Sequence, residues 1–376
     1  MSSAPMRFPY AISLLAGILG AQARDDAAPA ELTWKGKDLP RAEVAADDAG
    51  LAGVLEAWAP FADANGYRLV LDDDRRVLLV LSGSHERLKS GKENNAVKNY
   101  VELAGKTDAV CDGYLGAAEA GQAPLVLVCT RTVDYGKLLA HLRKLHPDLA
   151  GWLDGAGRSV AGFVLSEPLV AAWIEDPEGV TEWHPYNELV HRLAQLRVRR
   201  QATFLPDWLL LGLAWHTEEA VRRSVYCFPH RRGFVSAASH TDWGLWLANS
   251  FKARSRKKAG KPADLELSEF AGWRPGGDDG FDSGKAYLSF GVARYLASKH
   301  AEALRSLMHE LCAATEKGRK VWLSDTEWKT DPEYAVPVED QAKLLAAVDG
   351  DLMAEVSDWF RKKKANDRVA IGDHGR

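Results

Sequence analysis

The spacing of apolar residues changes once along the chain, near Pro185, and this change restricts the fold more than any other feature. Before it, short apolar runs alternate with helical patterns. After it, apolar residues recur at helical spacing almost to the C-terminus. Short apolar runs bounded by turn residues are typical of strands, whereas apolar positions three and four apart are typical of helices. The sequence therefore predicts an α+β fold, with a small N-terminal α/β layer over residues 51–180 followed by a mainly α-helical subdomain over residues 181–364.

The N-terminal layer is predicted to combine a β-hairpin with buried strands. The expected strands lie at residues 67–71, 77–82, 124–130, 160–165 and 169–175, and the expected helices at 94–104 and 134–146. The first two strands flank a polar turn at residues 72–76, which is a hairpin pattern. Asp134 precedes the second helix as an expected N-cap. No motif in this layer indicates a ligand site.

The second half is predicted to be helical, with two interrupting loops. The expected helices lie at about residues 185–202, 206–223, 241–252, 282–299, 301–316 and 339–364. The loops are a basic one at 252–262 and a glycine-rich one at 273–280. A polar linker is expected over residues 24–50 and a polar tail over residues 365–376.

The first 23 residues have the pattern of an export signal. Arg7 gives a positive start, residues 11–20 are apolar, and Ala21-Gln22-Ala23 is a small-x-small cleavage site. The apolar run is about half as long as a membrane-spanning helix requires, and an uncleaved anchor helix is the alternative. We therefore expect cleavage near Ala23 and export to the periplasm or the extracellular space, with no transmembrane segment in the mature chain.

The charge content excludes one class of partner, and the cysteines show no local zinc motif. Lys and Arg total 48 against 52 Asp and Glu, so no basic field exists to hold phosphate backbones, and nucleic acid is excluded as a general partner. The four cysteines are widely spaced and form no C-x-x-C pair, so they indicate no thiolate zinc motif. They predict either buried free thiols or a Cys111–Cys129 disulfide, the latter if both lie on neighbouring strands.

Two segments carry the strongest motif in the chain. Residues 183–191 read WHPYNELVH, and residues 205–214 read LPDWLLLGLA. This pair resembles the two-helix active site of gluzincin metallopeptidases, in particular the peptidase-MA-like exported bacterial proteins. In that family H-E-x-x-H lies on one helix and L-P-x-W-L-x-E-G-x-A begins the next. The resemblance covers residues 160–300 well and residues 65–362 loosely.

The resemblance implies a degenerate zinc site. Two His four apart lie on one helical face and bind one Zn²⁺, the adjacent Glu polarises its water, and a Glu from the next helix completes the ligands. Here Glu188 matches the general base and His191 the second His, whereas Asn187 stands at the first His and Leu211 at the third ligand. With two of three ligands replaced, Glu188 is a vestigial base and no metal or other cofactor is expected. Tyr287 matches a tyrosine that stabilises an oxyanion, with core packing as its alternative role.

The rival interpretation is an active zinc metallopeptidase with an atypical ligand set. His191, His216 and Glu218 are its candidate ligands, with His184 as a further one. His184 lies about 10 Å along the helix axis from His191, too far for both to bind one ion simply. In the preferred interpretation Glu188 and His191 are structural groups, and Leu211 fills apolar space. The predicted function is then an exported pseudo-metallopeptidase with a scaffold role or a peptide- or partner-binding role.

Tryptophan crowds the same region. Of 13 tryptophans, eight lie in one third of the chain: Trp152, Trp173, Trp183, Trp208, Trp215, Trp243, Trp246 and Trp273. Aromatic rings line peptide-binding grooves when exposed and fill core volume when buried. Their exposure decides between a binding groove and a filled core.

Overall fold

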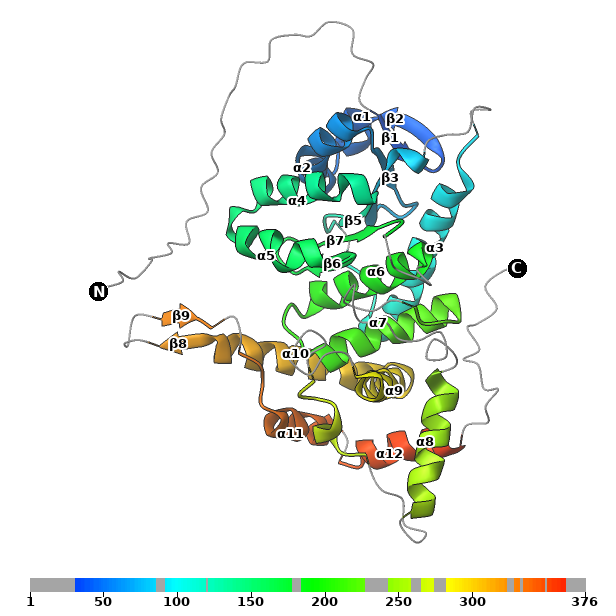
Figure 1. Cartoon of the computed structure of the whole chain (residues 1–376), viewed down its shortest axis with the longest axis vertical. Helices are drawn as coiled ribbons and strands as arrows, with labels where there is room; N and C mark the ends of the chain where they lie inside the picture. The colour runs from blue at the N-terminus through cyan, green and yellow to red at the C-terminus, as the bar shows by residue number, and fades with distance from the viewer. Residues whose placement is uncertain are drawn as a thin grey trace, which may run out of the picture. The chain divides into compact units, whose positions relative to one another are not determined.

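In a computed structural model, the N-terminal half of the protein is built around a seven-stranded mixed sheet (Figure 1). The structure describes residues 31–85, 92–119, 121–177, 184–226, 243–257, 265–273, 282–322, 328–331, 334–348 and 350–362. The strands are β1 (Glu31–Trp34), β2 (Lys37–Pro40), β3 (Arg68–Leu71), β4 (Val77–Leu81), β5 (Leu125–Thr130), β6 (Gly162–Leu165) and β7 (Val170–Ile174). Their order is β2-β1-β3-β4-β5-β7-β6. β4, β5 and β7 run parallel, with β3 and β6 antiparallel beside them.

Helices cover both faces of this sheet, which explains its continuous apolar strands. Alternate residues of β4 and β5 point to opposite faces. One face packs against α2 (Ala49–Asn65) and α4 (Tyr135–Leu145), and the other against α3 (Asn95–Leu115) and α6 (Pro185–Gln201). Shorter helices connect these elements: α1 (Arg41–Ala45), α5 (Ala150–Asp154) and the 3₁₀ turns η1 (Gly83–His85), η2 (Thr132–Asp134), η3 (Pro147–Leu149) and η4 (Ala156–Ser159).

The C-terminal half is helical and is built around α7 (Asp207–Arg222). The other elements are α8 (Trp243–Lys257), η6 (Leu267–Glu269), α9 (Ser283–Lys299), α10 (Ala301–Arg319), α11 (Val338–Val348), α12 (Leu352–Lys362) and a two-stranded ribbon of β8 (Lys320–Trp322) and β9 (Trp328–Thr330). α7 packs between α6 and α9. A Cβ at Gly212 would lie 2.5 Å from the carbonyl oxygen of Ser289, so the glycine allows α7 and α9 to approach closely.

The α+β prediction is confirmed, and the main differences lie at its edges. The linker predicted over residues 24–50 is folded from Glu31 on, since β1 and β2 form a hairpin and β1 also pairs with β3. Leu32 is fully buried there, and Lys35-Gly36 makes a two-residue turn with positive φ at both positions. The basic loop predicted from residue 252 is helical as far as Lys257.

In the part of the chain that the structure describes, the sheet and the helices that follow it belong to one compact unit. Cys111 and Cys129 are free thiols, because Cys111 lies on α3 and not on a strand beside Cys129. The predicted signal peptide (1–23) and tail (365–376) lie outside the described residues. Among the described helices, none combines the length and apolarity of a membrane span.

Candidate functional site

The two helices of the gluzincin-like motif enclose a buried polar cluster, here called the helix-pair cluster. It consists of Asn187, Glu188, His191 and Arg192 on α6 and Glu218 on α7, none of which exceeds 2% exposure. α6 starts at Pro185, which suits the first helical position because it has no N–H to satisfy. Residues four apart lie on the same face of a helix, so Asn187 and His191 share one face of α6, and Glu188 and Arg192 share another.

The carboxylate of Glu218 is the centre of this cluster. Its Oε1 accepts hydrogen bonds from Asn187 Nδ2 at 2.6 Å and from the backbone N–H of Tyr226 at 2.6 Å. Its Oε2 lies 3.2 Å from His191 Nδ1. Asn187 Nδ2 also donates to the carbonyl oxygen of Ser224 at 3.2 Å. A buried carboxylate is costly unless it is hydrogen-bonded, and three donors satisfy this one.

His191 is held as a neutral imidazole. Burial and, to a smaller extent, the charge of Arg192 lower its pKa to about 3, against an opposing effect of Glu188. Because a carboxylate only accepts hydrogen bonds, the contact with Glu218 assigns the proton to Nδ1. Nε2 then carries the lone pair and has no hydrogen-bond partner among the described residues. Glu218 therefore orients the ring from the edge opposite to this lone pair.

Glu188, the residue at the general-base position, is ion-paired with Arg192. The guanidinium Nη2 lies 2.6 Å from Glu188 Oε2, and both side chains are almost fully buried. Gly162 of β6 leaves room for this guanidinium, since a Cβ there would lie 2.5 Å from Nη2. The carboxylate is thus directed at a permanent cation of its own helix.

The position facing Asn187 and His191 is Glu218 and not Leu211. Leu211 lies two turns earlier on α7, about 10 Å along the axis, and packs in the apolar core of the helical half. The length of α6 explains this register. His191 lies 201 − 191 = 10 residues before the end of α6, so its neighbour in an antiparallel helix pair lies about 10 residues into α7, which begins at 207.

The other predicted site residues lie apart from this cluster or pack in the core. The ring of His216 packs beside Tyr114 at 5.9 Å. His184 stands at the N-cap position of α6 without a side-chain cap hydrogen bond, and its ring lies 3.9 Å from that of Tyr226. Tyr287 is buried against the rings of Trp243 at 4.7 Å and Trp246 at 4.2 Å.

The residues of the helix-pair cluster do not fit the zinc ion of the gluzincin pattern. Nε2 of His191 is the atom available to an ion, whereas Glu218 lies at the Nδ1 edge and is engaged by three donors. Glu188 is paired with Arg192. In the described part of the chain, a different set of side chains brings possible metal ligands together. It consists of His85, Cys129 and Glu175, whose ligand atoms lie within 4.8 Å of one another.

That second set lies where the parallel strands end, in what we call the sheet-edge cluster: Ser82, Ser84, His85, Cys129 and Glu175. β4 is followed by Ser82, β5 contains Cys129, and β7 is followed by Glu175. Backbone hydrogen bonds from Ser82 N to Cys129 O and from Glu175 N to Thr130 O continue the sheet here. The carboxyl edge of parallel strands is where open α/β sheets bind ligands.

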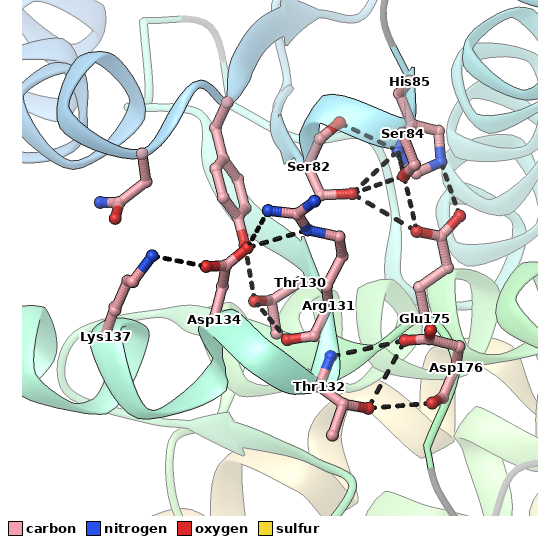
Figure 2. A network of polar contacts seen from close by, with 12 residues as sticks. Ser82, Ser84, His85, Thr130, Arg131, Thr132, Asp134, Lys137, Glu175 and Asp176 are labelled. Carbon is pink, nitrogen blue, oxygen red and sulfur yellow. Dashed lines mark hydrogen bonds and ion pairs between the residues drawn. The ribbon is translucent and has the colours of Figure 1, made fainter.

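Figure 2 shows the polar contacts of this edge. Nε2 of His85 lies 3.2 Å from Glu175 Oε1, and Nδ1 lies 3.1 Å from Ser84 Oγ. Ser84 Oγ also donates to Glu175 Oε2 at 2.8 Å. Although burial opposes it, contact with His85 and the two serine hydroxyls lowers the pKa of Glu175. Burial raises the pKa of the Cys129 thiol well above its usual range, and the charge of Glu175 adds to this.

A second polar group extends this edge along the start of α4 (Figure 2). Asp134 pairs with Arg131 at 2.5 Å and with Lys137 at 2.7 Å, so its side chain is an ion-pair partner instead of the predicted helix cap. Tyr67 shares a hydrogen bond with Thr130 at 2.7 Å, and burial raises its pKa to about 12.

The sequence analysis missed the sheet-edge cluster, because its members belong to no contiguous motif. A usable signal was present. Polar residues directly follow three separate apolar strands, and the carboxyl ends of parallel strands meet at one edge. Compared with models of known protein families and with curated proteins, the chain matches none.

Proposed function

We propose that this chain is an exported, catalytically inactive gluzincin-like protein, a pseudo-metallopeptidase whose α6–α7 pair is a structural scaffold instead of a zinc centre. One observation carries the proposal. The carboxylate oxygens of Glu218 accept hydrogen bonds from Asn187, His191 and the backbone N–H of Tyr226. In a gluzincin site, an ion would offset the buried carboxylate. Here hydrogen-bond donors supplied by the protein do so.

The replacement of the first ligand by asparagine suits this role. An amide binds zinc poorly, but its NH₂ group provides two donors. Asn187 uses both, one for Glu218 and one for the carbonyl oxygen of Ser224, and its Oδ1 accepts from Arg222 Nε at 3.2 Å. One side chain thereby ties α6 to α7 and to the segment that follows α7.

The tryptophans support a scaffold over a Trp-lined peptide groove. Trp173, Trp208, Trp215, Trp243 and Trp273 are buried, and the last four belong to the core of the helical half. Trp152 and Trp246 are 37% and 40% exposed. Trp183 lies outside the described residues. The described rings therefore serve mainly as core volume.

An active zinc metallopeptidase is the alternative, and one observation favours it. Nε2 of His191 is buried without a hydrogen-bond partner among the described residues, as a ligand atom would be without its ion. The alternative needs two more ligands at that edge of the ring.

The test combines zinc content with peptide hydrolysis for the purified full chain and for His191→Gln and Glu188→Gln. We expect no peptide hydrolysis that depends on Glu188, and no zinc that is lost on changing His191. Zinc lost in His191→Gln together with hydrolysis lost in Glu188→Gln, in variants whose far-UV circular dichroism matches the parent, would establish the active enzyme and overturn the proposal.

A further inference from the structure

Three different metal-binding groups converge at the carboxyl edge of the sheet. They are the imidazole of His85, the thiol of Cys129 and the carboxylate of Glu175, and one ligand atom from each lies within 4.8 Å of the other two. His85 and Cys129 are buried, whereas the side chain of Glu175 is 26% exposed. The residues come from three strand ends and are independent of the helix-pair cluster.

We propose that His85, Cys129 and Glu175 bind a single Zn²⁺ ion. Nitrogen, sulfur and carboxylate oxygen are the donors that zinc takes in proteins. A thiolate disfavours Mg²⁺ and Ca²⁺, which prefer all-oxygen ligand sets. The set therefore selects a borderline-soft divalent ion over the abundant hard ones.

The distances are close to what zinc requires. Bonds of about 2.0–2.3 Å to a tetrahedral zinc place its ligand atoms about 3.3–3.7 Å from one another. The 3.2 Å between His85 Nε2 and Glu175 Oε1 already agrees with this spacing. Cys129 Sγ lies within 4.8 Å of the other ligand atoms, so closing the site requires a shift of about 1 Å at most.

The surrounding hydroxyls orient the ligands from behind. Nδ1 of His85 faces Ser84 Oγ at 3.1 Å and Ser82 Oγ at 3.4 Å, so Nε2 is the nitrogen turned toward Glu175. Ser84 also fixes Glu175 through Oε2. Ligating histidines commonly have their second nitrogen fixed by such a partner. Tyr100 closes the buried side, with its OH 3.8 Å from Cys129 Sγ and its ring 5.4 Å from that of His85.

Charge balance favours the ion at this buried position. Zn²⁺ would meet one thiolate and one carboxylate, so the two positive charges are neutralised within the site. His85 would bind the ion through Nε2, which already faces Glu175, while Nδ1 faces the serine hydroxyls. Cys129 releases one proton to solvent for each ion bound, so zinc affinity rises about tenfold per pH unit while the free thiol stays protonated.

The test uses the full chain, stripped of metal with a chelator and titrated with Zn²⁺ by calorimetry in two buffers of different ionisation enthalpy. Co²⁺ serves as the spectroscopic probe. We expect one ion per chain with release of the Cys129 proton, and a thiolate-to-Co²⁺ charge-transfer band with tetrahedral ligand-field bands. Cys129→Ser and Glu175→Gln should each weaken zinc binding at least about tenfold.

Cys111→Ser is the matched control, because Cys111 is also a buried free thiol but lies on α3 away from the cluster. It should retain full zinc affinity and the charge-transfer band. Absence of zinc binding by the folded chain, or zinc binding and a thiolate band that survive Cys129→Ser, would overturn the proposal. Because the pseudo-metallopeptidase proposal depends on His191 and Glu188, the two proposals fail on different variants.

Discussion

The buried ion pair on α6 gives the sharpest test of a structural role for Glu188. Arg192 Nη2 lies 2.6 Å from Glu188 Oε2, and both side chains are almost fully buried. Removing one partner of such a pair leaves an uncompensated buried charge, which costs about 3–5 kcal/mol of unfolding free energy. We therefore expect Arg192→Met to destabilise the protein by this amount. Replacing both partners, as in Glu188→Leu/Arg192→Met, should recover most of the loss, because no buried charge remains.

The assay is urea unfolding followed by tryptophan fluorescence, since Trp173, Trp208 and Trp215 are fully buried. The chain supplies a matched control in Glu102 and Lys106, an ion pair of the same i,i+4 spacing at 2.5 Å on the exposed face of α3. Lys106→Met should cost no more than about 1 kcal/mol. The reasoning is refuted if Arg192→Met is no more destabilising than Lys106→Met, or if the double variant is as unstable as the single one.

Three further predictions test the helix pair and its packing against α9. The pKa of His191 is about 3 in the folded state against an ordinary 6.5. As pH falls from about 6.5 toward 3, only the unfolded chain binds a proton at His191, so the free energy of unfolding declines by about 1.4 kcal/mol per pH unit. In urea unfolding at a series of pH values, His191→Gln should remove this part of the slope, and an unchanged slope contradicts it. Gly212→Ala should destabilise by about 1–3 kcal/mol, since its Cβ would meet Ser289 O at 2.5 Å, and a neutral effect on the thermal midpoint would refute the close α7–α9 packing. The double variant Asn187→His/Leu211→Glu should fold poorly and bind no additional zinc in metal analysis, because position 211 lies in an apolar core. An extra zinc equivalent that requires both substitutions would show that the helix register, with Glu218 facing His191, is wrong.

Periodicity predicted the architecture well, because burial on both faces imposes long apolar runs on the central strands. β4 and β5 are buried along their whole length, and their sequences show it directly. The β1–β2 hairpin escaped prediction for the converse reason. β1 has four residues and β2 is mostly exposed, so the local pattern is too short and too polar to stand out.

The candidate sites were less predictable, because both depend on non-local geometry. The interval from His191 to Leu211 gives only a distance along the sequence, whereas the residue that faces His191 depends on where α6 ends and α7 begins. α6 runs on to Gln201, and this moves Glu218 into the facing position. At the sheet edge, His85 and Glu175 are 90 positions apart in the sequence (175 − 85) and meet only because β4, β5 and β7 are parallel neighbours.

One buried side chain, Tyr100, links the sheet-edge cluster to the first turn of α6. Tyr100 on α3 contacts Cys129 with its hydroxyl and packs its ring against His85 on one side and Tyr186 on the other, at 5.1 Å from the latter. Tyr186 lies in the first turn of α6, directly before Asn187. Since packed cores transmit displacement instead of absorbing it, a shift of α6 would displace the Tyr186 and Tyr100 rings that pack behind the sheet-edge cluster. The scaffold proposal and the ion-site proposal are therefore linked by packing: a scaffold role for the helix pair would act on the proposed ion site through Tyr186 and Tyr100, without contact with the ion.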